Sequence, residues 1–485
     1  MSSLTRRQFL HGSAAGTAAL GLPAFHRAPR RNEELRVAVV GLNQRGQAHV
    51  NGLHGLADVR VVALCDVDTR VLARSTQLFT DRGEEVDGCT DVRKLLERDD
   101  IDAVSLATPN HLHALHTIWA CQAGKDVYVE KPVSHNIWEG RQALRAAERY
   151  GRIVQCGTQS RSSQGIAQGI AWLQAGHLGK ITHAWGTCFK PRKSIGKVAG
   201  PQAVPEEVDW PRYCGPRGVL PLLREKLHYD WHWQFATGCG DLGNQGIHQM
   251  DLCRWGLGQQ RLAPSVLSVG GRFGYDDDGD TPNTQLVYLD YQPAPLVFEV
   301  RGLPRNKAAR ESRNWAQTMD MRNEAAVGAT IHAEGGYLLL PNYTSAHAFD
   351  NDRRRLQDFR GALDHFQNFV DAVRARDASL LASPLLEGHL SSALCHMGND
   401  SYRLGAPAEP EVIDAACAEP PLLKETWERF RAHMHAHELD LEQDRATLGA
   451  ALRVDPATEA YVDNDAANVL RRGTYVEGFE VPEEV

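Results

Sequence analysis

The sequence lacks the features typical of nucleic-acid-binding and zinc-ribbon proteins. Its 53 Lys and Arg residues are outnumbered by 61 Asp and Glu residues, and the net charge of −8 argues against a basic nucleic-acid-binding face. None of the ten cysteines belongs to a C-x-x-C pair, so buried free thiols are expected. No internal repeat or long low-complexity tract occurs. The 485 residues are enough for two or three globular domains.

Long hydrophobic runs are also missing, so no membrane anchor is expected. The apolar run from Gly12 to Ala24 is too short to span a bilayer and follows "TRRQFL", from Thr5 to Leu10. Adjacent arginines before such a run resemble a twin-arginine export signal; the alternative is a frayed terminus with a chance Arg-Arg pair. We predict a signal peptide over residues 1–30 and a periplasmic or otherwise exported protein. This route carries folded proteins, often with their cofactor bound.

Strand and helix patterns alternate over residues 35–155. "RVAVVG" is a continuous apolar run that ends in glycine, as a buried parallel strand does, and "VRVVALCDVD" is a second such run. The amphipathic stretch "IWEGRQALRAAERYG" ends at Gly151, a typical helix C-cap. The alternation predicts a doubly wound parallel sheet, which is a Rossmann-type α/β domain.

The pattern changes after residue 155. Four strand-like segments, "ITHAWGTCF", "SVLSVGGRFGY", "TQLVYLDYQ" and "PLVFEVRG", follow, with helices expected around 163–175 and 244–256. They predict a second domain over residues 156–405 that has a mostly antiparallel sheet. The polar stretch 406–485 contains one helical pattern and is expected to be a C-terminal extension.

The turn "GLNQRG", from Gly41 to Gly46, follows the first strand and opens a helix. It matches G-x-G-x-x-G at its outer glycines, with Asn43 in the middle, and its backbone amides are suited to a pyrophosphate. Asp66 ends the second strand 20 residues after Gly46, where a carboxylate binds a ribose diol and repels a 2′-phosphate. This favours NAD over NADP. Asp66 could instead cap the next helix, a role that Asp68 fits better.

The segment "ATPNHLH" leaves the third strand at the carboxyl edge of the sheet, where ligands bind in such folds. Thr108, Pro109 and Asn110 are expected to shape the wall beside the nicotinamide. His111 and His113 have the look of a metal-binding pair. The sequence places no third ligand near them, so no metal site is predicted.

A lysine at the same edge of the sheet is the sharpest local signal. In "VEKPVS", Lys131 follows a buried strand and precedes Pro132, which fixes the backbone and can form a cis peptide bond. A charged side chain facing a cofactor could hold a substrate hydroxyl, or lower its pKa, while a hydride leaves. The alternative is an ordinary surface lysine.

A second polar stretch, "GDLGNQGIHQMD", runs from Gly240 to Asp251. On one continuous helix Asn244, His248 and Asp251 share a face, because positions i, i+4 and i+7 align. An amide, an imidazole and a carboxylate on one stripe indicate chemistry rather than core packing.

These motifs, "VVGLNQRG", "CD" at 65–66, "ATPNHLH" and above all "EKP" at 130–132, resemble the glucose-fructose oxidoreductase/inositol dehydrogenase/MocA (Gfo/Idh/MocA) family over roughly residues 35–405. The resemblance implies a dinucleotide-binding domain followed by an α/β domain with a large, open, mostly antiparallel sheet. Its members are mostly NAD(P)-dependent oxidoreductases of sugars and cyclitols, and a minority are glycosidases that use bound NAD as a transient oxidant. It also implies a homodimer or homotetramer that pairs through the open sheet face.

The resemblance assigns roles to particular residues. Lys131 matches the catalytic lysine of "EKP", and the family motif G-x-x-x-D-x-G-x-H-x-x-D aligns with Gly240 to Asp251, with Asn244 in place of its first aspartate. An amide cannot titrate, so the expected proton acceptor is His248, near its ordinary pKa of about 6.5, or Lys131. Asn244 then binds a substrate hydroxyl or caps the helix, and Asp251 braces the helix or His248.

Three further stretches carry polar and aromatic side chains. "KPRKSIG" (190–196) could bind hydroxyls or a carboxylate, or form a solvated turn, and "HYDWHW" (228–233) could line a sugar pocket or join the core. "HMHAH" (433–437) is expected on a solvated helix face. The expected cofactor contacts are Gly41, Asn43, Arg45, Gly46, Asp66, Thr108, Pro109, Asn110, His113, Glu130 and Lys131. The expected substrate contacts are Lys131, Arg192, Lys193, His228, Trp231, Asn244 and His248, of which Lys131, Asn244 and His248 are the catalytic candidates.

The predicted reaction is hydride transfer between a carbon of a sugar, cyclitol or glycoside and tightly bound NAD. An exported enzyme meets no known pool that recycles NADH, so the cofactor should be restored within the active site. The alternative is a glycosidase that works by transient oxidation, elimination, hydration and re-reduction, although the histidine-containing motif of the family's better-known glycosidase branch is not found. A non-catalytic cofactor-binding sensor is a third hypothesis, against which both Lys131 and His248 argue.

Overall fold

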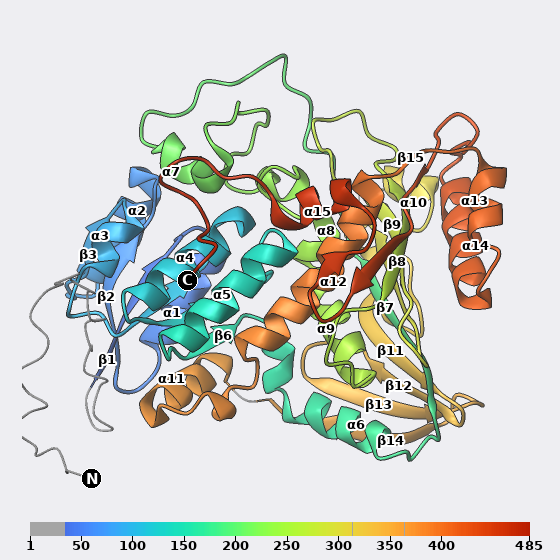
Figure 1. The fold of residues 1–485 in the computed structure, drawn as a ribbon, viewed down its shortest axis with the longest axis horizontal. Helices are drawn as coiled ribbons and strands as arrows, with labels where there is room; N and C mark the ends of the chain where they lie inside the picture. Colours follow the sequence, from blue (N-terminus) through green and yellow to red (C-terminus); the bar gives the residue numbers. More distant parts are fainter. Residues whose placement is uncertain (1–33, 313, 363) are drawn as a thin grey trace, which may run out of the picture.

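The computed structural model describes residues 34–485, apart from 313 and 363. The predicted signal peptide, residues 1–30, lies outside the described residues. Figure 1 shows a Rossmann unit, coloured blue to cyan, beside a unit built on one large sheet. Across the described residues, no helix is long and apolar enough to cross a membrane.

The first unit contains the expected parallel sheet, with strand order β3-β2-β1-β4-β5-β6. The strands β4, β5 and β6 are buried along their whole length because helices cover both faces, as in any doubly wound sheet, whereas the edge strand β3 is largely exposed. The strands are β1 (Leu35–Val40), β2 (Val59–Cys65), β3 (Asp87–Cys89), β4 (Ala103–Leu106), β5 (Asp126–Val129) and β6 (Val154–Cys156). The helices are α1 (Arg45–His54), α2 (Thr69–Thr80), α3 (Val92–Leu96), α4 (Asn110–Gln122) and α5 (Ile137–Arg149).

The second unit is a twelve-stranded sheet whose main path runs β14-β13-β12-β11-β7-β10-β9-β8-β16-β15. Every pairing is antiparallel except that of β10 with β7, so the expected mostly antiparallel sheet is confirmed. The strands before the extension are β7 (Ile181–Phe189), β8 (Ser265–Gly271), β9 (Thr284–Leu289), β10 (Leu296–Arg301), β11 (Val327–Ala333), β12 (Gly336–Leu340), β13 (Ser345–Asp350) and β14 (Arg355–Arg360).

Helices fill the space between the large sheet and the Rossmann unit (Figure 1). The longest of them, α12 (Leu385–Arg403), packs against β8, α5 and α9, so it joins the two units. One buried apolar cluster runs from these helices into the sheet. The helices and 3-10 turns are η1 (Gln159–Ser162), α6 (Gln164–Gln174), α7 (Trp210–Cys214), η2 (Gly215–Arg217), η3 (Asp230–Trp233), α8 (Gly240–Asn244), α9 (Gly246–Gly256), α10 (Lys307–Glu311), η4 (Trp315–Gln317), α11 (His365–Ala375) and η5 (Ala378–Leu380).

Residues 406–485 fold onto both units. Four short strands extend the large sheet at β8, two helices cover its outer face, and the last residues return to the Rossmann unit, where the red ribbon ends beside α4 in Figure 1. The elements are β15 (Ala406–Pro407), α13 (Pro410–Ala416), α14 (Pro421–Ala436), β16 (Thr447–Leu448), β17 (Leu452–Asp455), β18 (Ala460–Tyr461) and α15 (Asp465–Arg472).

The helix α14 occupies part of the outer sheet face. Its side chains Trp427, Phe430 and Met434 share one buried cluster with Trp185 and Tyr288 of the sheet. The resemblance implied that subunits pair through this face. Because the chain's own helix covers part of it, less of the face is left for a partner, and a homodimer or homotetramer stays a prediction.

His433 and His437 of "HMHAH" do not lie on a solvated face, so that expectation is wrong for this pair, whereas His435 between them is exposed. His433 is 3% exposed and His437 is 2% exposed, with ring centroids 4.9 Å apart. His437 contacts the carbonyl oxygen of Pro304 through Nε2 at 2.7 Å. Both rings are buried because this side of α14 packs on the sheet, which a pattern of helical polar residues does not reveal.

Candidate cofactor and substrate site

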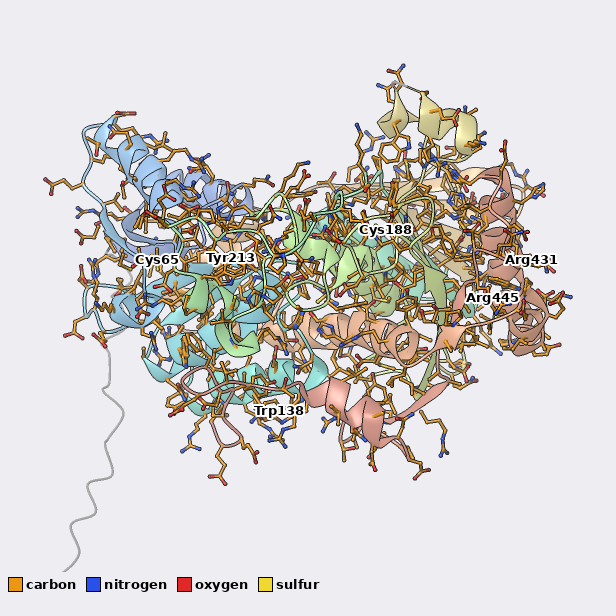
Figure 2. The ribbon with its side chains drawn as sticks, turned by 90° about the horizontal axis from the view of Figure 1, so that it is seen from above. Cys65, Trp138, Cys188, Tyr213, Arg431 and Arg445 are labelled. Carbon is orange, nitrogen blue, oxygen red and sulfur yellow. The ribbon has the colours of Figure 1, made fainter. Side chains whose placement is uncertain are left out.

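A cavity of about 330 Å³ opens along the carboxyl edge of the Rossmann sheet. Its walls come from both units: the turns after β1, β2, β4 and β5 form one side, and the segments around residues 190–192, 228–232 and 244–245 form the other. Seen from above in Figure 2, Cys65 and Tyr213, which line it, lie in the Rossmann half, and Cys188 lies in the sheet half. The cavity is where a ligand binds in open α/β folds.

The turn after β1 needs glycine at both of its ends. Gly41 has φ +79°, and a Cβ there would lie 2.7 Å from the carbonyl oxygen of Ala107. A Cβ on Gly46 would come within 1.8 Å of the carbonyl oxygen of Gly41. The next helix, α1, starts without a side-chain cap at Gln44, and Asn43 lines the cavity. The turn therefore leaves a helix N-terminus available to an anion.

Asp66 lines the same cavity and is held in place by main-chain amides. Its carboxylate accepts hydrogen bonds from the amides of Leu42 at 2.8 Å and Asp68 at 3.0 Å. Burial raises the pKa of Asp66, and these amides oppose the rise. A carboxylate has about four lone-pair sites, so acceptor capacity remains for a ribose diol. The helix-capping role belongs to Asp68, which accepts from the amide of Arg70.

Four buried polar atoms that belong to residues lining this cavity have no protein partner. They are Thr108 Oγ1, Asn110 Oδ1, His116 Nδ1 and Arg212 Nε. A buried polar atom without a hydrogen bond is costly, so these atoms indicate a polar ligand. Together with the glycine turn and Asp66, they fit a nicotinamide dinucleotide.

His111 and His113 act separately. His113 lines the cavity and contacts the carbonyl oxygens of Thr108 and Pro132, each at 2.6 Å, so it ties together the turns after β4 and β5. His111 contacts the carbonyl oxygens of Tyr213 and Thr237 instead. Burial lowers the pKa of both histidines. Within the described chain, no group of three His, Cys, Asp or Glu side chains could hold a metal ion.

Lys131 lines the cavity, two residues after the end of β5. Its Nζ donates a 2.7 Å hydrogen bond to the main-chain oxygen of Asn244, and its bond to Pro132 is cis. Burial lowers the pKa of Lys131; the carboxylate of Glu130 opposes this, and the positive charges of Arg45 and Lys190 add to it. A lysine with a lowered pKa is suited to accept a proton.

Glu130 does not face a cofactor as a free carboxylate. It is 4% exposed and pairs with Arg45 at 2.7 Å and with His49 at 3.0 Å. The pKa of Glu130 is well below its ordinary value because Arg45 and the hydrogen bond from His49 outweigh the effect of burial. This buried network fixes the turn on which Lys131 stands. Arg45 and Glu130 both line the cavity.

The stretch from Gly240 to Asp251 is not one continuous helix. The helix α8 ends at Asn244, α9 begins at Gly246, and Gln245 lies between them. Asn244 therefore caps neither helix, and its capping role is wrong. It lines the cavity, half-buried, and presents its carbonyl oxygen to Lys131.

His248 is 4% exposed and does not line the cavity directly. Its pKa lies well below the ordinary value, because of burial and then the charge of Lys131, so the expectation of a pKa near 6.5 is wrong. Its Nδ1 has no protein partner, and its ring packs edge-on against Tyr343 at 5.2 Å. His248 is therefore a neutral, weakly basic imidazole behind the cavity wall.

Asp251 supports the fold rather than His248. Its fully buried carboxylate pairs with Arg161 at 2.8 Å and accepts a 2.7 Å hydrogen bond from Ser391. Arg161 also pairs with Glu387 at 2.9 Å. These contacts fasten α9 to η1 and α12, so of the two roles left open for Asp251, bracing the helix is the one observed.

The segment 190–196 contributes two cations to the cavity and directs a third away. Lys190 donates to Gln245 Oε1 at 2.7 Å, and Arg192 forms two hydrogen bonds, at 2.7 and 2.8 Å, with Asp241. Lys193 instead lies 5.7 Å from the ring of Trp315, outside this cavity. Lys190 and Gln245, which line the cavity, were not among the predicted contacts.

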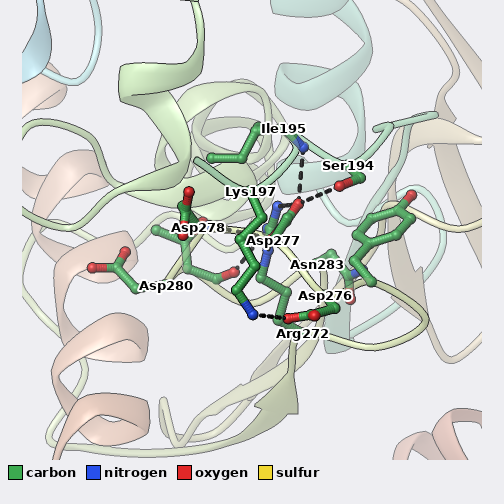
Figure 3. Close-up of polar contacts among 12 residues, drawn as sticks. Ser194, Ile195, Lys197, Arg272, Asp276, Asp277, Asp278, Asp280 and Asn283 are labelled. Atoms are coloured by element: carbon green, nitrogen blue, oxygen red, sulfur yellow. Dashed lines mark hydrogen bonds and ion pairs between the residues drawn. The ribbon is translucent and has the colours of Figure 1, made fainter. Parts of the chain in front are cut away.

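An acidic loop holds the outer end of this segment, as Figure 3 shows. Asp277 accepts hydrogen bonds from the amide of Ile195 at 2.8 Å and from Ser194 at 2.9 Å, and it pairs with Arg272. Asp278 accepts from the amide of Val198 at 2.7 Å. The segment is therefore fastened from behind, which excludes a freely solvated turn.

The segment "HYDWHW" lies across the cavity from Lys131's strand. His228 and Trp231 both line the cavity. His228 Nε2 contacts Asp68 at 2.8 Å, next to the turn that holds Asp66, and the ring of Trp231 stacks on His232 at 3.6 Å. His228 is thus placed beside the predicted ribose position rather than beside Lys131.

The sheet topology, the glycine turn and the acidic residue after β2 define a Rossmann-type oxidoreductase fold. Residues 35–158 match the sequence model described as "Oxidoreductase family, NAD-binding Rossmann fold", of the Gfo/Idh/MocA type. The match covers the Rossmann unit of the chain. Residues 3–23 match the model of the twin-arginine translocation signal, which indicates export.

Two curated relatives share part of the chain. A glycosyl hydrolase family 109 protein from Shewanella pealeana is 36% identical over 141 residues, which are 28% of this chain and 30% of the relative. A 4-carboxy-2-hydroxymuconate-6-semialdehyde dehydrogenase from Sphingobium sp. is 28% identical over 176 residues, 36% of this chain and 55% of that protein. Each match thus covers less than two thirds of the relative's length.

Solved structures share the fold over most of the chain. The WlbA dehydrogenase from Bordetella pertussis, in complex with NADH and UDP-GlcNAcA, is 19% identical with a TM-score of 0.55, covering 76% of this chain and 97% of that one. Levoglucosan dehydrogenase, in complex with NADH and L-sorbose, is 17% identical with a TM-score of 0.57, covering 76% and 96%. At these identities the likeness establishes the two-unit architecture.

Proposed function

We propose that the protein is an NAD-dependent oxidoreductase that acts on a sugar, cyclitol or glycoside and keeps its cofactor bound. The observation that carries the proposal is the position of Lys131. Its amine contacts the main-chain oxygen of Asn244, which lines the cavity on the side of the second unit. The glycine turn and Asp66 line the same cavity on the side of the Rossmann unit. Solved neighbours with this fold hold NADH together with a sugar or sugar-nucleotide ligand, which supports the substrate class.

The cofactor would be held by residues of the Rossmann unit. The turn from Gly41 to Gly46 would bind the pyrophosphate, and Asp66 would accept hydrogen bonds from the adenosine ribose. Thr108 and Asn110 would give their unpartnered oxygens to the nicotinamide half. When bound, NAD supplies the acceptor for a hydride. The carboxylate of Asp66 disfavours NADP.

Lys131 is the proposed proton acceptor. As a hydride leaves the substrate carbon, the proton of the hydroxyl on that carbon passes to the neutral amine of Lys131, and a carbonyl group forms. The lowered pKa makes the neutral amine available. Lys190 and Asn244, which line the same wall, would bind other hydroxyls of the substrate. His248, which is neutral and behind the wall, supports this surface rather than taking the proton.

A redox-neutral glycosidase is the second candidate, and the glycosyl hydrolase family 109 relatives favour it. In this reaction a glycoside is oxidised at a ring carbon, a proton is removed from the adjacent carbon and the aglycone leaves. Water then adds, and the hydride returns to the ring carbon. Lys131 would accept the hydroxyl proton in the oxidation and return it in the reduction. The cofactor would stay bound throughout. Such chemistry suits an exported protein that cannot recycle NADH outside the cell.

The experiment is to purify the protein and follow nicotinamide absorbance at 340 nm with a panel of free sugars and glycosides. NADH formed in proportion to a free sugar supports the dehydrogenase. A signal that appears and decays with one glycoside, while free sugar accumulates, supports the glycosidase. A protein that neither retains nor binds a dinucleotide contradicts both.

A further inference from the structure

The segment that contains Phe479 contributes to the cavity described above. Phe479 lines the cavity, and Val481 and Val485, which are 4% and 8% exposed, belong to the apolar cluster beneath α4 and α5. In Figure 1 this segment is the red ribbon that leaves α15, passes α7 and ends beside α4. More than 300 residues separate it from the Rossmann unit that it covers.

Polar contacts fasten the segment on both sides of Phe479. On the preceding side, the hydroxyl of Tyr475 donates to Glu139 at 3.1 Å. On the following side, Gln142 donates from Nε2 to the carbonyl oxygens of Pro482 and Glu483, the latter at 2.7 Å. Glu139 and Gln142 both belong to α5. The segment is therefore hydrogen-bonded to α5 both before and after Phe479, which fixes the position of this residue.

Phe479 lies at the adenosine end of the cavity. Its ring centroid is 6.1 Å from that of Trp119 on α4, and the guanidinium of Arg93 lies 5.6 Å from it. Arg93 is on α3, which follows β3 at the edge of the sheet next to β2, whereas Lys131 follows β5. Asp66 after β2 marks the ribose, so the end lined by Arg93 and Phe479 is the one away from the nicotinamide.

A polar atom at the same end has no partner. His116 Nδ1 is buried without a hydrogen bond, in a residue that is 6% exposed and lines the cavity. Its ring stacks on Trp119 at 5.6 Å. An unpartnered imidazole nitrogen beside two aromatic faces suits a flat heteroaromatic base with hydrogen-bonding edges.

We propose that the segment Tyr475–Val485 is part of the cofactor site, with Phe479 and Trp119 as apolar walls and His116 as the hydrogen-bonding group for the adenine of the dinucleotide. The inference rests on the proposed binding of NAD. Release of the cofactor then requires this segment to lift from α5. The segment therefore slows dissociation, which is the property that an enzyme with a resident cofactor needs.

The test measures release of the cofactor, not turnover. Protein loaded with NADH is mixed with excess NAD, and loss of bound-NADH fluorescence gives the dissociation rate. We expect NADH to dissociate about tenfold faster from Phe479→Ala, since loss of stacking on one base changes affinity on the order of five- to a hundredfold. Leu380→Ala is the matched control, because Leu380 is 47% exposed and lies outside the cavity; its rate should equal that of the unchanged protein.

A second variant tests whether faster release from Phe479→Ala reflects only a local packing defect. A chain shortened after residue 474 removes both anchors, and far-UV circular dichroism reports whether the rest is folded. We expect a folded protein with faster release than Phe479→Ala. Unchanged release from Phe479→Ala, or from a folded shortened chain, overturns the inference while leaving NAD binding in place. Failure of the unchanged protein to bind NADH overturns the proposed function instead.

Discussion

The Nζ of Lys131 donates a 2.7 Å hydrogen bond to the main-chain carbonyl oxygen of Asn244, and this contact joins the two units across the cavity. The acceptor is a backbone atom, so the contact does not depend on the side chain at position 244. An asparagine can therefore replace the family's aspartate without loss of the group that positions the lysine. The replacement removes a negative charge from the surroundings of the Lys131 amine.

Removal of the Lys131 amine should stop turnover and spare cofactor binding. We expect Lys131→Ala to lower kcat by about a thousandfold or more, because general base catalysis contributes 10²–10⁴-fold. NADH titration by fluorescence should give a Kd within a few-fold of the unchanged value. Lys180→Ala, at an exposed position before β7, is the control and should retain full kcat. Full activity of Lys131→Ala would refute its assigned role.

Restoring the carboxylate at position 244 should shift the pH dependence. A negative charge beside Lys131 favours its ammonium form and raises its pKa, whereas the neutral amine is the form that accepts a proton. We therefore expect Asn244→Asp to move the acid limb of kcat/KM toward higher pH by about one unit. Asn244→Ala, which adds no charge, should leave the inflection in place. An identical inflection in Asn244→Asp and the unchanged protein would show that Lys131 is not the titrating group.

Asp251 should matter for stability and not for proton transfer. Asp251→Asn leaves Arg161 without half of its buried charge partners, and breaking such a pair costs about 3–5 kcal/mol. We expect a clear fall in the unfolding midpoint measured by thermal denaturation. The pH profile of kcat/KM at a temperature where the variant is folded should not move. A shift of the pH profile of kcat/KM would show that Asp251 affects proton transfer, as expected if it orients His248.

Asp66 should decide between the two cofactors. Hydrogen bonds to a charged group contribute about 1.5–3 kcal/mol, so Asp66→Ala should weaken NAD binding about tenfold or more. NADP binding should improve because the repulsion of its 2′-phosphate is gone. Kd values from fluorescence titration check both effects. Asp68→Ala is the control, since Asp68 caps α2; it should lower stability and keep the preference for NAD.

Acid should destabilise the protein from about pH 6.5 downward. Burial lowers the pKa of His116 and His396 to about 3 and that of His365 to about 4, while in the unfolded chain each is about 6.5. Below 6.5 the unfolded state binds protons that the folded state does not, so stability is full above that pH and falls toward the folded pKa values. Each histidine contributes about 1.4 kcal/mol per pH unit. Urea unfolding at pH 7 and pH 5.5 measures the loss.

The architecture was predictable because its signals are local. The apolar run of β1, the glycine turn after it and Asp66 lie within about thirty residues, and each pattern follows from the period and the backbone of one element. The same reasoning located Lys131 at the end of β5. The strands β7 to β10 could also be predicted, since each is a short run rich in β-branched, aromatic and other apolar residues.

The second wall of the cavity was less predictable because its partners are distant in sequence. Asp251 meets Arg161, 90 residues earlier, and Lys190 meets Gln245, 55 residues later. The break at Gln245 depends on packing too, since a Cβ on Gly246 would lie 3.0 Å from the ring of Phe298. The role of Phe479 had no local signal at all.

The position of Phe479 also constrains the order of events during synthesis. The Rossmann unit leaves the ribosome more than 300 residues before Phe479, which forms part of the cavity wall, is made. A nascent first domain can meet NAD while that end of the cavity is still open. Final enclosure must wait until translation has passed residue 479, so the first domain can take up its cofactor before that end of the cavity closes.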